Sequence, residues 1–400
     1  MRIGRIIPVV VLGTTLIAAT PTGAGASDDP LAGVDAALRQ AATKILGTAQ
    51  PGDPLKVVTT TRTSGAPKIT TAIAPTRTSA LDLIVAGLQK PATIGVDIAH
   101  EVSIDVSNDT YRSRQWALTR LGAETAWKTS TGRGVVVAVI DTGVKAVHVD
   151  LAGRVLAGRD FVAPGTSASD ANGHGTHVAG IIAAIANNRR GVAGLAPNAR
   201  ILPVRVLDKT GVGDTANVAK GIVWAVDRGA KVINLSLSST SPDTATRAAV
   251  AYAIAKNVVV VAAAGNSGCG LLGSPTSYPA AYDGVLGVGA ITSGGAVASF
   301  SSCGSWVDVV APGSGILSTV PTSPYSALGC PANYCTLSGT SMAAPHAAAA
   351  AALEIAKLGS AARQATVRSL IESTADDIVW SGRDVYSGNG VINPHRMLAR

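Results

Sequence analysis

Strand-like and helix-like segments alternate through the middle of this chain, and this alternation restricts its fold more than any other feature. The strand-like runs are short and mostly apolar, and they cover residues 134–141, 199–208, 230–238 and 258–266. Apolar runs of this length are typical of strands buried on both faces. Segments with helical periodicity lie between them, at residues 174–186, 215–229 and 244–257. The order predicts a mostly parallel sheet with helices on both faces.

The composition supports a large core and excludes one class of partner. A chain of 400 residues with 47% apolar and 14% charged residues has room for one large domain plus extras, or for two domains. The formal net charge is +8. No run of lysine and arginine with interleaved aromatic residues accompanies this charge, so we expect a diffuse basic surface and no nucleic-acid partner.

The N-terminus resembles a secretory signal. Arg2 and Arg5 precede an apolar run over residues 6–19, and small residues follow up to Ala24-Gly25-Ala26. This order of charged, apolar and small residues predicts a signal peptide over residues 1–26. A retained anchor is the alternative, but the run is short for a membrane span. We expect a secreted, extracellular protein that has no membrane contact once the signal is removed.

A small α+β unit is predicted next, with its core at about residues 55–104. The expected strands cover residues 55–62, 67–74 and 93–104, and a helix over residues 79–90 has Ser79 as its N-cap. A weakly helical stretch at residues 31–46 precedes this core. The polar segment 106–116 is interpreted as a linker and cleavage zone. The predicted boundaries are 27–108 for this unit and 109–400 for the rest.

The four cysteines predict disulfides rather than a metal site. Cys269, Cys303, Cys330 and Cys335 form an even set in a chain expected to be exported, and none of them makes a C-x-x-C pair. Three pairings are open. We favour Cys269 with Cys303 and Cys330 with Cys335, because this pairing closes one small loop and one larger loop.

Polar residues follow two of the buried strand-like runs, where a parallel sheet binds its ligands. Asp141 ends the first run and Asn266 follows the last. A carboxylate at the end of a buried strand is costly unless it is paired. Each residue also has a structural interpretation: Asp141 as a helix cap or turn residue, and Asn266 as a turn residue.

Two further residue types with catalytic chemistry lie at predicted helix starts. His174 stands between Gly173 and Gly175, which permit close backbone approach, and Ser341 precedes an alanine-rich helix. A serine at a helix start is usually a cap, but the amide groups there also favour a developing negative charge.

Metal and nucleotide chemistry fit the sequence poorly. His174 and His177 frame H-G-T-H, which lacks the glutamate and the third ligand of a zinc protease site. Residues 268–273 read GCGLLG and match G-x-G-x-x-G, but two prolines follow within the next stretch. They bar the helix that would have to receive a dinucleotide pyrophosphate.

Taken together, five motifs resemble the subtilisin-like serine protease family (subtilases). They are VAVIDTGV, NGHGTHVAGII, AAAGN, SGTSMAAPH and GNGVIN, and the resemblance covers roughly residues 115–395. The order of Asp141, His174 and Ser341 is the family's order for its catalytic residues. The resemblance implies a three-layer subtilisin-like α/β fold, with a central, mostly parallel sheet and helices on both faces, preceded by the small α+β unit as propeptide.

The resemblance also assigns roles to these residues. Ser341 would attack the peptide carbonyl and His174 would be the general base. Asp141 would orient His174, and Asn266 would stabilise the oxyanion. His177 and His346 would be structural. No cofactor is implied for the chemistry.

Substrate contacts are implied along two segments and one wall of the specificity pocket. The residues are Gly211, Gly213, Ser236, Leu237, Ser238, Ala263, Ala264 and Gly265. The family usually has glycine where this chain has Ser238, and its Cβ would narrow the pocket. With no acidic residue placed to bind lysine or arginine, we expect cleavage after apolar or aromatic residues of protein or peptide substrates.

Further expectations concern metal, regulation and assembly. Asp150 and Asn188 match positions for a structural calcium ion, and a solvated loop carrying Arg189 and Arg190 is the alternative. The propeptide would act as inhibitor and chaperone, although it lacks the family's clear first helix. We expect a monomer. A dedicated processing protease and a catalytically silent binding module are the rival functions.

Overall fold

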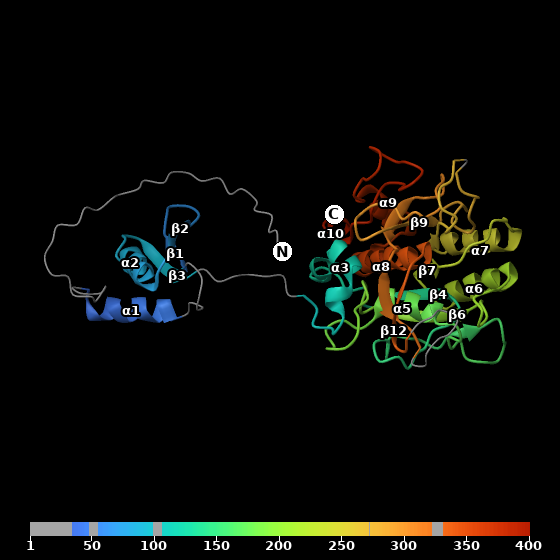
Figure 1. Ribbon diagram of the computed structural model, residues 1–400, viewed down its shortest axis with the longest axis horizontal. Coiled ribbons are helices and arrows are strands. Elements are labelled where there is room, and N and C mark those ends of the chain that lie inside the picture. The colour runs from blue at the N-terminus through green and yellow to red at the C-terminus, as the bar shows by residue number, and fades with distance from the viewer. Residues whose placement is uncertain (1–33, 48–54, 99–105, 272, 322–330) are drawn as a thin grey trace. The chain divides into compact units, whose positions relative to one another are not determined.

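The chain divides into two compact units, residues 1–103 and 104–400. The computed structural model describes residues 34–47, 55–98, 106–271, 273–321 and 331–400 (Figure 1). The predicted signal peptide, residues 1–26, lies outside the described residues.

The smaller unit packs two helices on a three-stranded antiparallel sheet. Its elements are α1 (Ala36–Gly47), β1 (Leu55–Thr61), β2 (Lys68–Ala74), α2 (Arg77–Leu88) and β3 (Thr93–Ile98). The strand order is β2-β1-β3, with both pairs antiparallel. One face of the sheet is buried because Val57, Val96 and Ile98 pack with Ile84 and Leu46 in one apolar cluster.

Two expectations for this unit need correction. Thr76, not Ser79, is the N-cap of α2: its hydroxyl accepts from Ser79 N, and the Ser79 hydroxyl accepts from Thr76 N, which makes a capping box. The weakly helical stretch is a regular helix, α1, because Ala42 and Leu46 pack into the unit's core. The unit therefore has the first helix that the sequence did not make clear.

The larger unit is built on a seven-stranded sheet in which every adjacent pair is parallel. The strands are β4 (Val136–Asp141), β5 (Arg159–Asp160), β6 (Arg200–Arg205), β7 (Val232–Leu235), β8 (Val259–Ala263), β9 (Leu286–Ile291) and β10 (Val309–Pro312), in the spatial order β10-β9-β8-β7-β4-β6-β5. A separate antiparallel ribbon pairs β11 (Ile316–Thr319) with β12 (Tyr334–Leu337). The predicted parallel sheet is confirmed.

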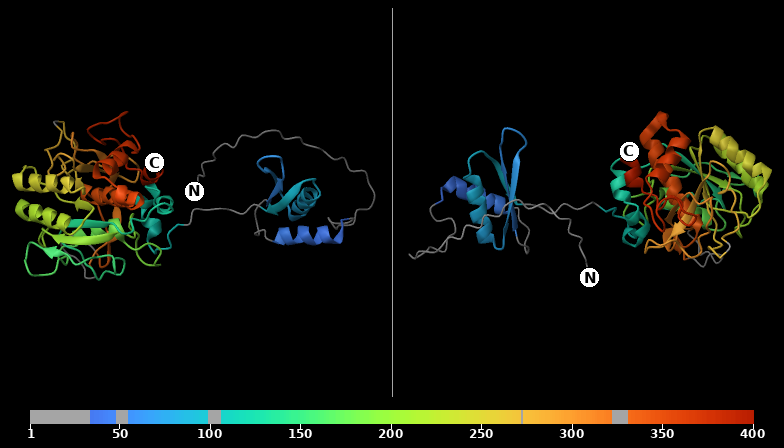
Figure 2. Two further views of the ribbon diagram at one scale, coloured as in Figure 1. Left: turned by 180° about the vertical axis from the view of Figure 1, so that it is seen from behind. Right: turned by 90° about the horizontal axis from the view of Figure 1, so that it is seen from above.

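Helices cover both faces of this sheet, so the unit has the predicted three layers. On one side lie α5 (His174–Ala183) and α8 (Thr340–Leu358), and on the other lie α6 (Thr215–Asp227) and α7 (Thr244–Ala255), side by side in Figure 2. The remaining helices are α3 (Trp116–Arg120), α4 (Ala123–Trp127), α9 (Gln364–Ser373) and α10 (Pro394–Leu398), with short 3₁₀ turns at Arg112–Arg114 and Gly359–Ala361.

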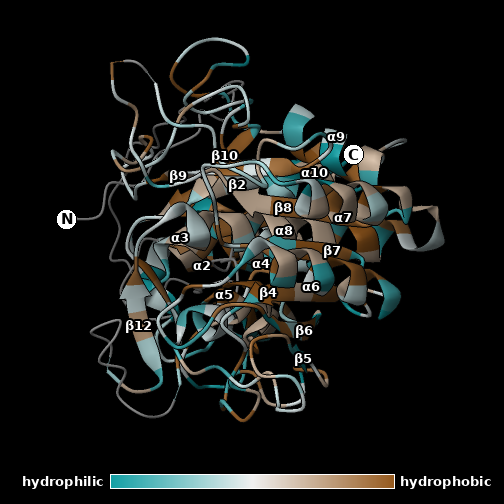
Figure 3. Cartoon of the chain, turned by 90° about the vertical axis from the view of Figure 1, so that its right-hand side faces the viewer, coloured by the Kyte–Doolittle hydropathy of each residue, from teal (hydrophilic) through white to brown (hydrophobic). Residues whose placement is uncertain are grey.

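The strands serve two cores because their side chains alternate. In β4, Val137 and Val139 enter the cluster beneath α5 and α8, whereas Ala138 and Ile140 enter the cluster beneath α6 and α7. All four side chains are fully buried. The strands are mostly brown in Figure 3, which marks apolar residues. This two-sided burial explains why the strands read as continuous apolar runs.

Helix α8 crosses the centre of the unit, and most of its buried side chains are only the methyl groups of alanine. Eight alanines along it, Ala343, Ala344 and Ala347–Ala352, are each at most 1% exposed. It contacts β7, β8, β9 and β10 of the sheet as well as α5. Small side chains let the helix lie close to the sheet, and this close packing holds its N-terminus rigidly.

The segment predicted as a linker belongs to the larger unit from Ser107 onward. The buried Asp109 carboxylate accepts from the backbone amides of Asn187 and Asn188 at 3.0 and 2.9 Å. Buried Arg112 pairs with Glu124 at 2.7 Å. These contacts fix a stretch whose polar composition had suggested an exposed linker. Within the described ranges, no helix combines the length and the apolar character needed to cross a membrane.

Candidate active site

The first component of the site is a buried carboxylate at the end of a strand. Asp141 is the last residue of β4, and it is 0% exposed. Its Oδ1 accepts the Thr142 backbone N–H at 2.7 Å and lies 2.8 Å from His174 Nδ1, while Oδ2 lies 3.0 Å from the same nitrogen. With Asp141 ionised, His174 Nδ1 carries the proton and donates it, which leaves Nε2 as the free base.

A glycine allows this pair to form. Gly175 follows His174 in the first turn of α5, and a Cβ on Gly175 would lie 2.1 Å from the Gly143 carbonyl oxygen. No side chain fits at that distance. The helix start can therefore approach the end of β4 only with glycine here, and this approach brings His174 within reach of Asp141.

The surroundings of His174 favour its protonated form. Burial alone would lower the pKa of His174, but the charge and hydrogen bond of Asp141, with a further contribution from Asp170, raise the pKa above its ordinary value. The side chain retains 21% exposure, so it remains accessible from the solvent side. A base of this kind can accept a proton and hold it while the charge is stabilised.

Asp170 is a member of the site that sequence reasoning missed. Its Oδ1 accepts from Thr142 Oγ1 and from the amides of Asn172 and Gly173, and its Oδ2 accepts from Thr176 N and Oγ1, at 2.6–2.9 Å. It thereby ties the loop before His174 to the residue after Asp141. Burial raises the pKa of Asp170 despite these bonds. A lone aspartate in a polar loop carries no sequence signal for this role.

His177 lies one turn further along α5 and has a different environment. It is fully buried, and its Nε2 donates to the carbonyl oxygens of Ile316 and Cys335, both at 3.0 Å. Burial, with like charge from His174, lowers the pKa of His177 to about 3. His346 is also buried, and burial lowers its pKa to about 4. Both imidazoles are therefore neutral.

Ser341 approaches the pair from a third element. It is the second residue of α8, after Gly339 and Thr340. Among the contacts of the described residues, Ser341 Oγ donates to the Ser236 carbonyl oxygen at 3.2 Å, and no hydrogen bond joins it to His174. Catalytic hydrogen bonds are often formed only in the substrate complex. Proton transfer from Ser341 to His174 would require the hydroxyl to rotate away from Ser236.

Asn266 lies beside the start of α8 and is held there by Thr340. The Thr340 backbone N and Oγ1 both donate to Asn266 Oδ1, at 2.8 and 3.0 Å. Because Oδ1 is engaged twice, the amide orientation is fixed and Nδ2 is left as a donor. Thr340 is a second residue that sequence reasoning missed, since its motif position indicates only a helix start.

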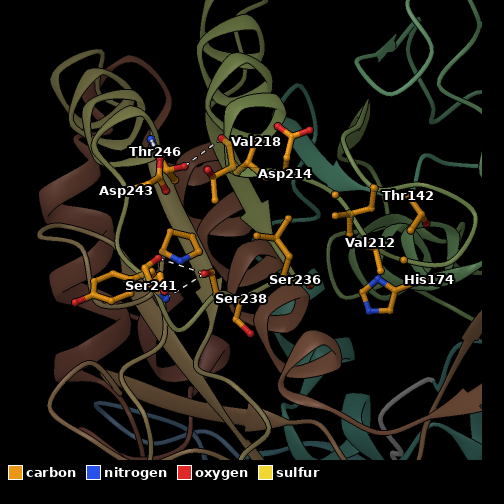
Figure 4. Close-up of a pocket in the computed structure, with 18 of the residues that line it drawn as sticks. Thr142, His174, Val212, Asp214, Val218, Ser236, Ser238, Ser241, Asp243 and Thr246 are labelled. Carbon is orange, nitrogen blue, oxygen red and sulfur yellow. Dashed lines mark hydrogen bonds between the residues drawn. The ribbon is translucent and has the colours of Figure 1, made fainter.

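A cleft of about 490 Å³ runs from His174 to the N-termini of α6 and α7 (Figure 4). Five of the predicted substrate residues line it: Gly211, Gly213, Ser236, Leu237 and Ser238. A Cβ on Gly213 would lie 2.3 Å from the Val206 carbonyl oxygen, so glycine is needed for this rim to pack. Ala263, Ala264 and Gly265 do not line this cleft.

The predicted calcium loop is closed by its own hydrogen bonds. Asp150 is fully buried, so it does not belong to a solvated loop. Its Oδ1 accepts from Asn188 Nδ2 at 2.8 Å, and its Oδ2 accepts from Val192 N and Tyr334 OH at 2.9 and 3.0 Å. The oxygen donors suit calcium, but as they lie they leave no open ligand position. The described residues also contain no group of three or more His, Cys, Asp or Glu arranged to hold a metal ion.

A disulfide joins Cys269 to Cys303, across the loop that begins shortly after Asn266. The cysteine proposed as the partner of Cys335, Cys330, lies outside the described residues. None of the cysteines that the structure describes is free.

Comparisons with known proteins agree with this geometry. The profile of the subtilase family matches residues 132–390. Thermitase from Thermoactinomyces vulgaris is 46% identical over 293 residues, which cover 73% of this chain and 98% of thermitase. Subtilisin DY from Bacillus licheniformis is 44% identical over 262 residues, 66% of this chain and 90% of that protein.

A solved structure shows the same fold. It is described as proteases from Pseudoalteromonas arctica PAMC 21717, and it is 34% identical with a TM-score of 0.67, covering 74% of this chain and 99% of that one. The family profile covers most of the larger unit, and the relatives align over nearly their whole lengths. This chain therefore belongs to the subtilase family and is a serine-type endopeptidase.

Proposed function

We propose that the chain hydrolyses peptide bonds with Ser341 as nucleophile and His174 as general base. Asp141 is the carboxylate that orients the imidazole and stabilises its positive charge. The observation that carries this proposal is the hydrogen bond of 2.8 Å between His174 Nδ1 and the buried Asp141. It leaves His174 Nε2 unprotonated and able to accept the Ser341 proton.

The reaction proceeds in two halves. Ser341 Oγ attacks the substrate carbonyl while its proton passes to His174 Nε2. His174 then donates that proton to the leaving amine, and an acyl-enzyme on Ser341 remains. Water attacks the acyl-enzyme and gives a proton to His174. The bond between the acyl carbon and Ser341 Oγ then breaks, the product carboxylic acid leaves, and the proton returns to Ser341 Oγ. Asp141 stays ionised throughout, and no cofactor enters these steps.

The negative oxygen formed in each half would be held by Asn266 Nδ2 and the Ser341 backbone N–H. The double engagement of Asn266 Oδ1 by Thr340 supports this assignment, because it leaves Nδ2 as the free donor. Donors positioned in advance cost no reorganisation during the reaction. A single donor of this type contributes about 3–4 kcal/mol of transition-state stabilisation, the magnitude known from subtilisin.

The substrate is proposed to be an extended polypeptide held between residues 211–213 and 236–238. The cleft supports this proposal, since both segments line it next to His174. Cleavage after apolar or aromatic side chains is proposed because the apolar side chains of Val212, Val218 and Leu237 line this cleft. Broad specificity is favoured over a processing role, and the enzyme is proposed to act as a monomer.

The smaller unit is proposed as the propeptide of an exported zymogen. Its sheet exposes Ile69 and Ile73 of β2, at 64% and 72%, on the face opposite the buried Ala74. An apolar face of this kind is typical of a surface that covers a partner. Self-cleavage is proposed within the segment from about residue 104 to residue 115, on the N-terminal side of Asp109 and Arg112, because these two residues are fixed within the larger unit. N-terminal sequencing that found residue 27 on the active enzyme would contradict this.

A structural calcium ion at Asp150 and Asn188 is a separate proposal, supported by the chemistry of the donors alone. Its binding requires Asn188 to give up its Nδ2 bond to Asp150 and to turn its Oδ1 toward the cation. Thermal unfolding during a calcium titration tests it. A rise in unfolding temperature that Asp150→Asn abolishes supports the site, and an unchanged temperature contradicts it.

The main experiment measures casein hydrolysis by the purified mature enzyme beside Ser341→Ala, with and without a serine-directed covalent inhibitor. We expect activity in the wild type alone, lost with either the substitution or the inhibitor. A wild type that labels at Ser341 but leaves casein intact would favour the processing role. A protein that neither cleaves nor labels would be a silent binding module.

A further inference from the structure

Ser236 and Ser341 exchange two hydrogen bonds, although they lie 105 residues apart in sequence. Ser236 Oγ donates to the Ser341 carbonyl oxygen at 2.8 Å, and Ser341 Oγ donates to the Ser236 carbonyl oxygen at 3.2 Å. Ser236 directly follows β7, whereas Ser341 lies in the first turn of α8. The side chain of Ser236 therefore contacts the backbone that carries the nucleophile, in addition to any role at the cleft.

A hydroxyl has one proton, so its direction decides whether this link holds. Asn234 Nδ2 donates to Ser236 Oγ at 2.9 Å. Because Ser236 Oγ accepts from Asn234, its own proton is available for the Ser341 carbonyl. The chain of donors thus runs from Asn234 through Ser236 to the backbone of Ser341.

Asn234 is an unusual residue for its position. It lies within β7, pairs in register with Val139 and Val261 on the neighbouring strands, and is 0% exposed. Its neighbours Ile233 and Leu235 belong to the core beneath α6 and α7, so Asn234 points to the α8 side. Asn234 Oδ1 has no hydrogen-bond partner among the described residues. A buried amide with one unpaired atom is destabilising, and an apolar side chain would avoid this cost.

We propose that Asn234 is a positioning residue for the nucleophile. Its amide orients the Ser236 hydroxyl, and this hydroxyl holds the Ser341 carbonyl and with it the first turn of α8. The turn carries Ser341 Oγ and the Ser341 backbone N–H, so a small displacement changes both the attack on the carbonyl and the stabilisation of the oxyanion. The inference rests on the proposed role of Ser341. Asn234 contacts neither substrate nor reacting atoms.

The test is a double-mutant cycle on kcat and KM with a chromogenic peptide. Asn234→Leu keeps the size of the side chain but removes the donor, and Ser236→Ala removes the link itself. Each single variant is expected to lower kcat about 10-fold with KM changed less than about twofold, the pattern of an interaction made in the transition state. The double variant is expected to be no slower than Ser236→Ala, because Asn234 acts through Ser236.

Val232→Ala is the matched control. Val232 lies two residues earlier on the same strand, in the core beneath α8, and it has no polar contact with Ser236. It should lower the unfolding temperature with kcat unchanged. If Asn234 has only a packing role, Asn234→Leu will behave like this control, or its effect on kcat will add to that of Ser236→Ala. Either result overturns the inference.

Two further measurements keep the result interpretable. If Asn234→Leu does not fold, Asn234→Asp replaces it, because a carboxylate of the same shape accepts the Ser236 proton and should lower kcat in the same way. Labelling of Ser341 by the covalent inhibitor separates the two proposals. A wild type that neither cleaves nor labels refutes the proposed function, whereas an active wild type with an equally active Asn234→Leu refutes this inference alone.

Discussion

Helix α5 presents two histidines one turn apart, and the structure gives them opposite surroundings. His174 faces a carboxylate that raises its pKa, whereas His177 faces two carbonyl oxygens, and burial lowers its pKa to about 3. The two pKa values differ because the hydrogen-bond partners of the two imidazoles differ, since both histidines belong to the same helix. A charged acceptor on β4 supports the proposed role of the first as a base, whereas neutral acceptors in the core make a hydrogen-bond donor of the second.

The largest expected effect on activity comes from the removal of the His174 imidazole. His174→Ala is expected to lower kcat by about 10⁶-fold, the size of single triad losses in subtilisin, since the nucleophile then has no base. The unfolding temperature should change little, because the side chain is partly exposed. A steady-state assay beside a thermal melt measures both. Residual activity within 100-fold of the wild type would show that another group accepts the proton.

The next effect concerns Asp141, which distinguishes the two imidazoles. Asp141→Asn is expected to lower kcat by about 10⁴-fold, because an amide no longer selects the tautomer in which Nε2 is free. The same change should move the acid limb of the pH–activity profile to lower pH, since the raised pKa of His174 depends on the charge of Asp141. An unchanged limb would contradict the assignment of that limb to His174.

Replacement of His177 should have the reverse pattern. His177→Leu removes the donor to the Ile316 and Cys335 carbonyl oxygens, and it is expected to cost about 2–4 kcal/mol of unfolding free energy. Below its lowered unfolding temperature, kcat should stay within about tenfold of the wild type. Denaturant unfolding and the peptide assay test the two halves. A loss of kcat without a loss of stability would place His177 in the reaction.

The smallest effect is on the pH dependence of stability. The folded-state pKa of His177 lies at about 3, below the ordinary value of 6.5, so its contribution is complete above pH 6.5 and is lost as the pH falls toward 3. Between pH 7 and pH 5 the loss of unfolding free energy from His177 is roughly 2 kcal/mol. His174 has the opposite sign: its contribution is complete below pH 6.5 and is lost as the pH rises through its raised pKa.

Unfolding free energies at pH 7 and pH 5 measure this effect. The wild type should lose stability on acidification, and His177→Leu should lose roughly 2 kcal/mol less than the wild type over the same interval. His346, with a pKa lowered to about 4, should continue to contribute in both proteins. An identical pH dependence in the two proteins would mean that folding does not lower the pKa of His177.

The sequence predicted the elements whose signals are local. The apolar runs became β4, β6, β7 and β8 because both faces of the sheet are covered. The cap of α2 was misplaced because Thr76 and Ser79 are both good capping residues, and only the backbone conformation separates them. Helix α1 was predicted only as a weakly helical stretch, because Ala42 and Leu46 stabilise it through packing in the unit's core and not through a local sequence signal.

The residues around the site could be predicted only in part. Asp141 and His174 were located through motifs that resemble a family, and the structure brings them together. Asp170, Thr340 and Asn234 were missed because each acts through contacts that only the folded chain creates. Thr340, for example, reaches Asn266 across 74 residues of sequence. No local pattern of residue types reports such a contact.

Helix α8 has a consequence for how the gene can change. Its buried alanines lie along one helix that has Ser341 near its N-terminus. A single nucleotide substitution changes any alanine codon into a codon for a larger side chain. Ala351 lies about 15 Å along the helix from Ser341. Because Ala351 is fully buried, the two extra methyl groups of a valine there would displace the helix from the sheet. Inactivating changes in a random library should therefore cluster along this helix, far from the cleft, and drift in this stretch should be slow even where no residue meets a substrate.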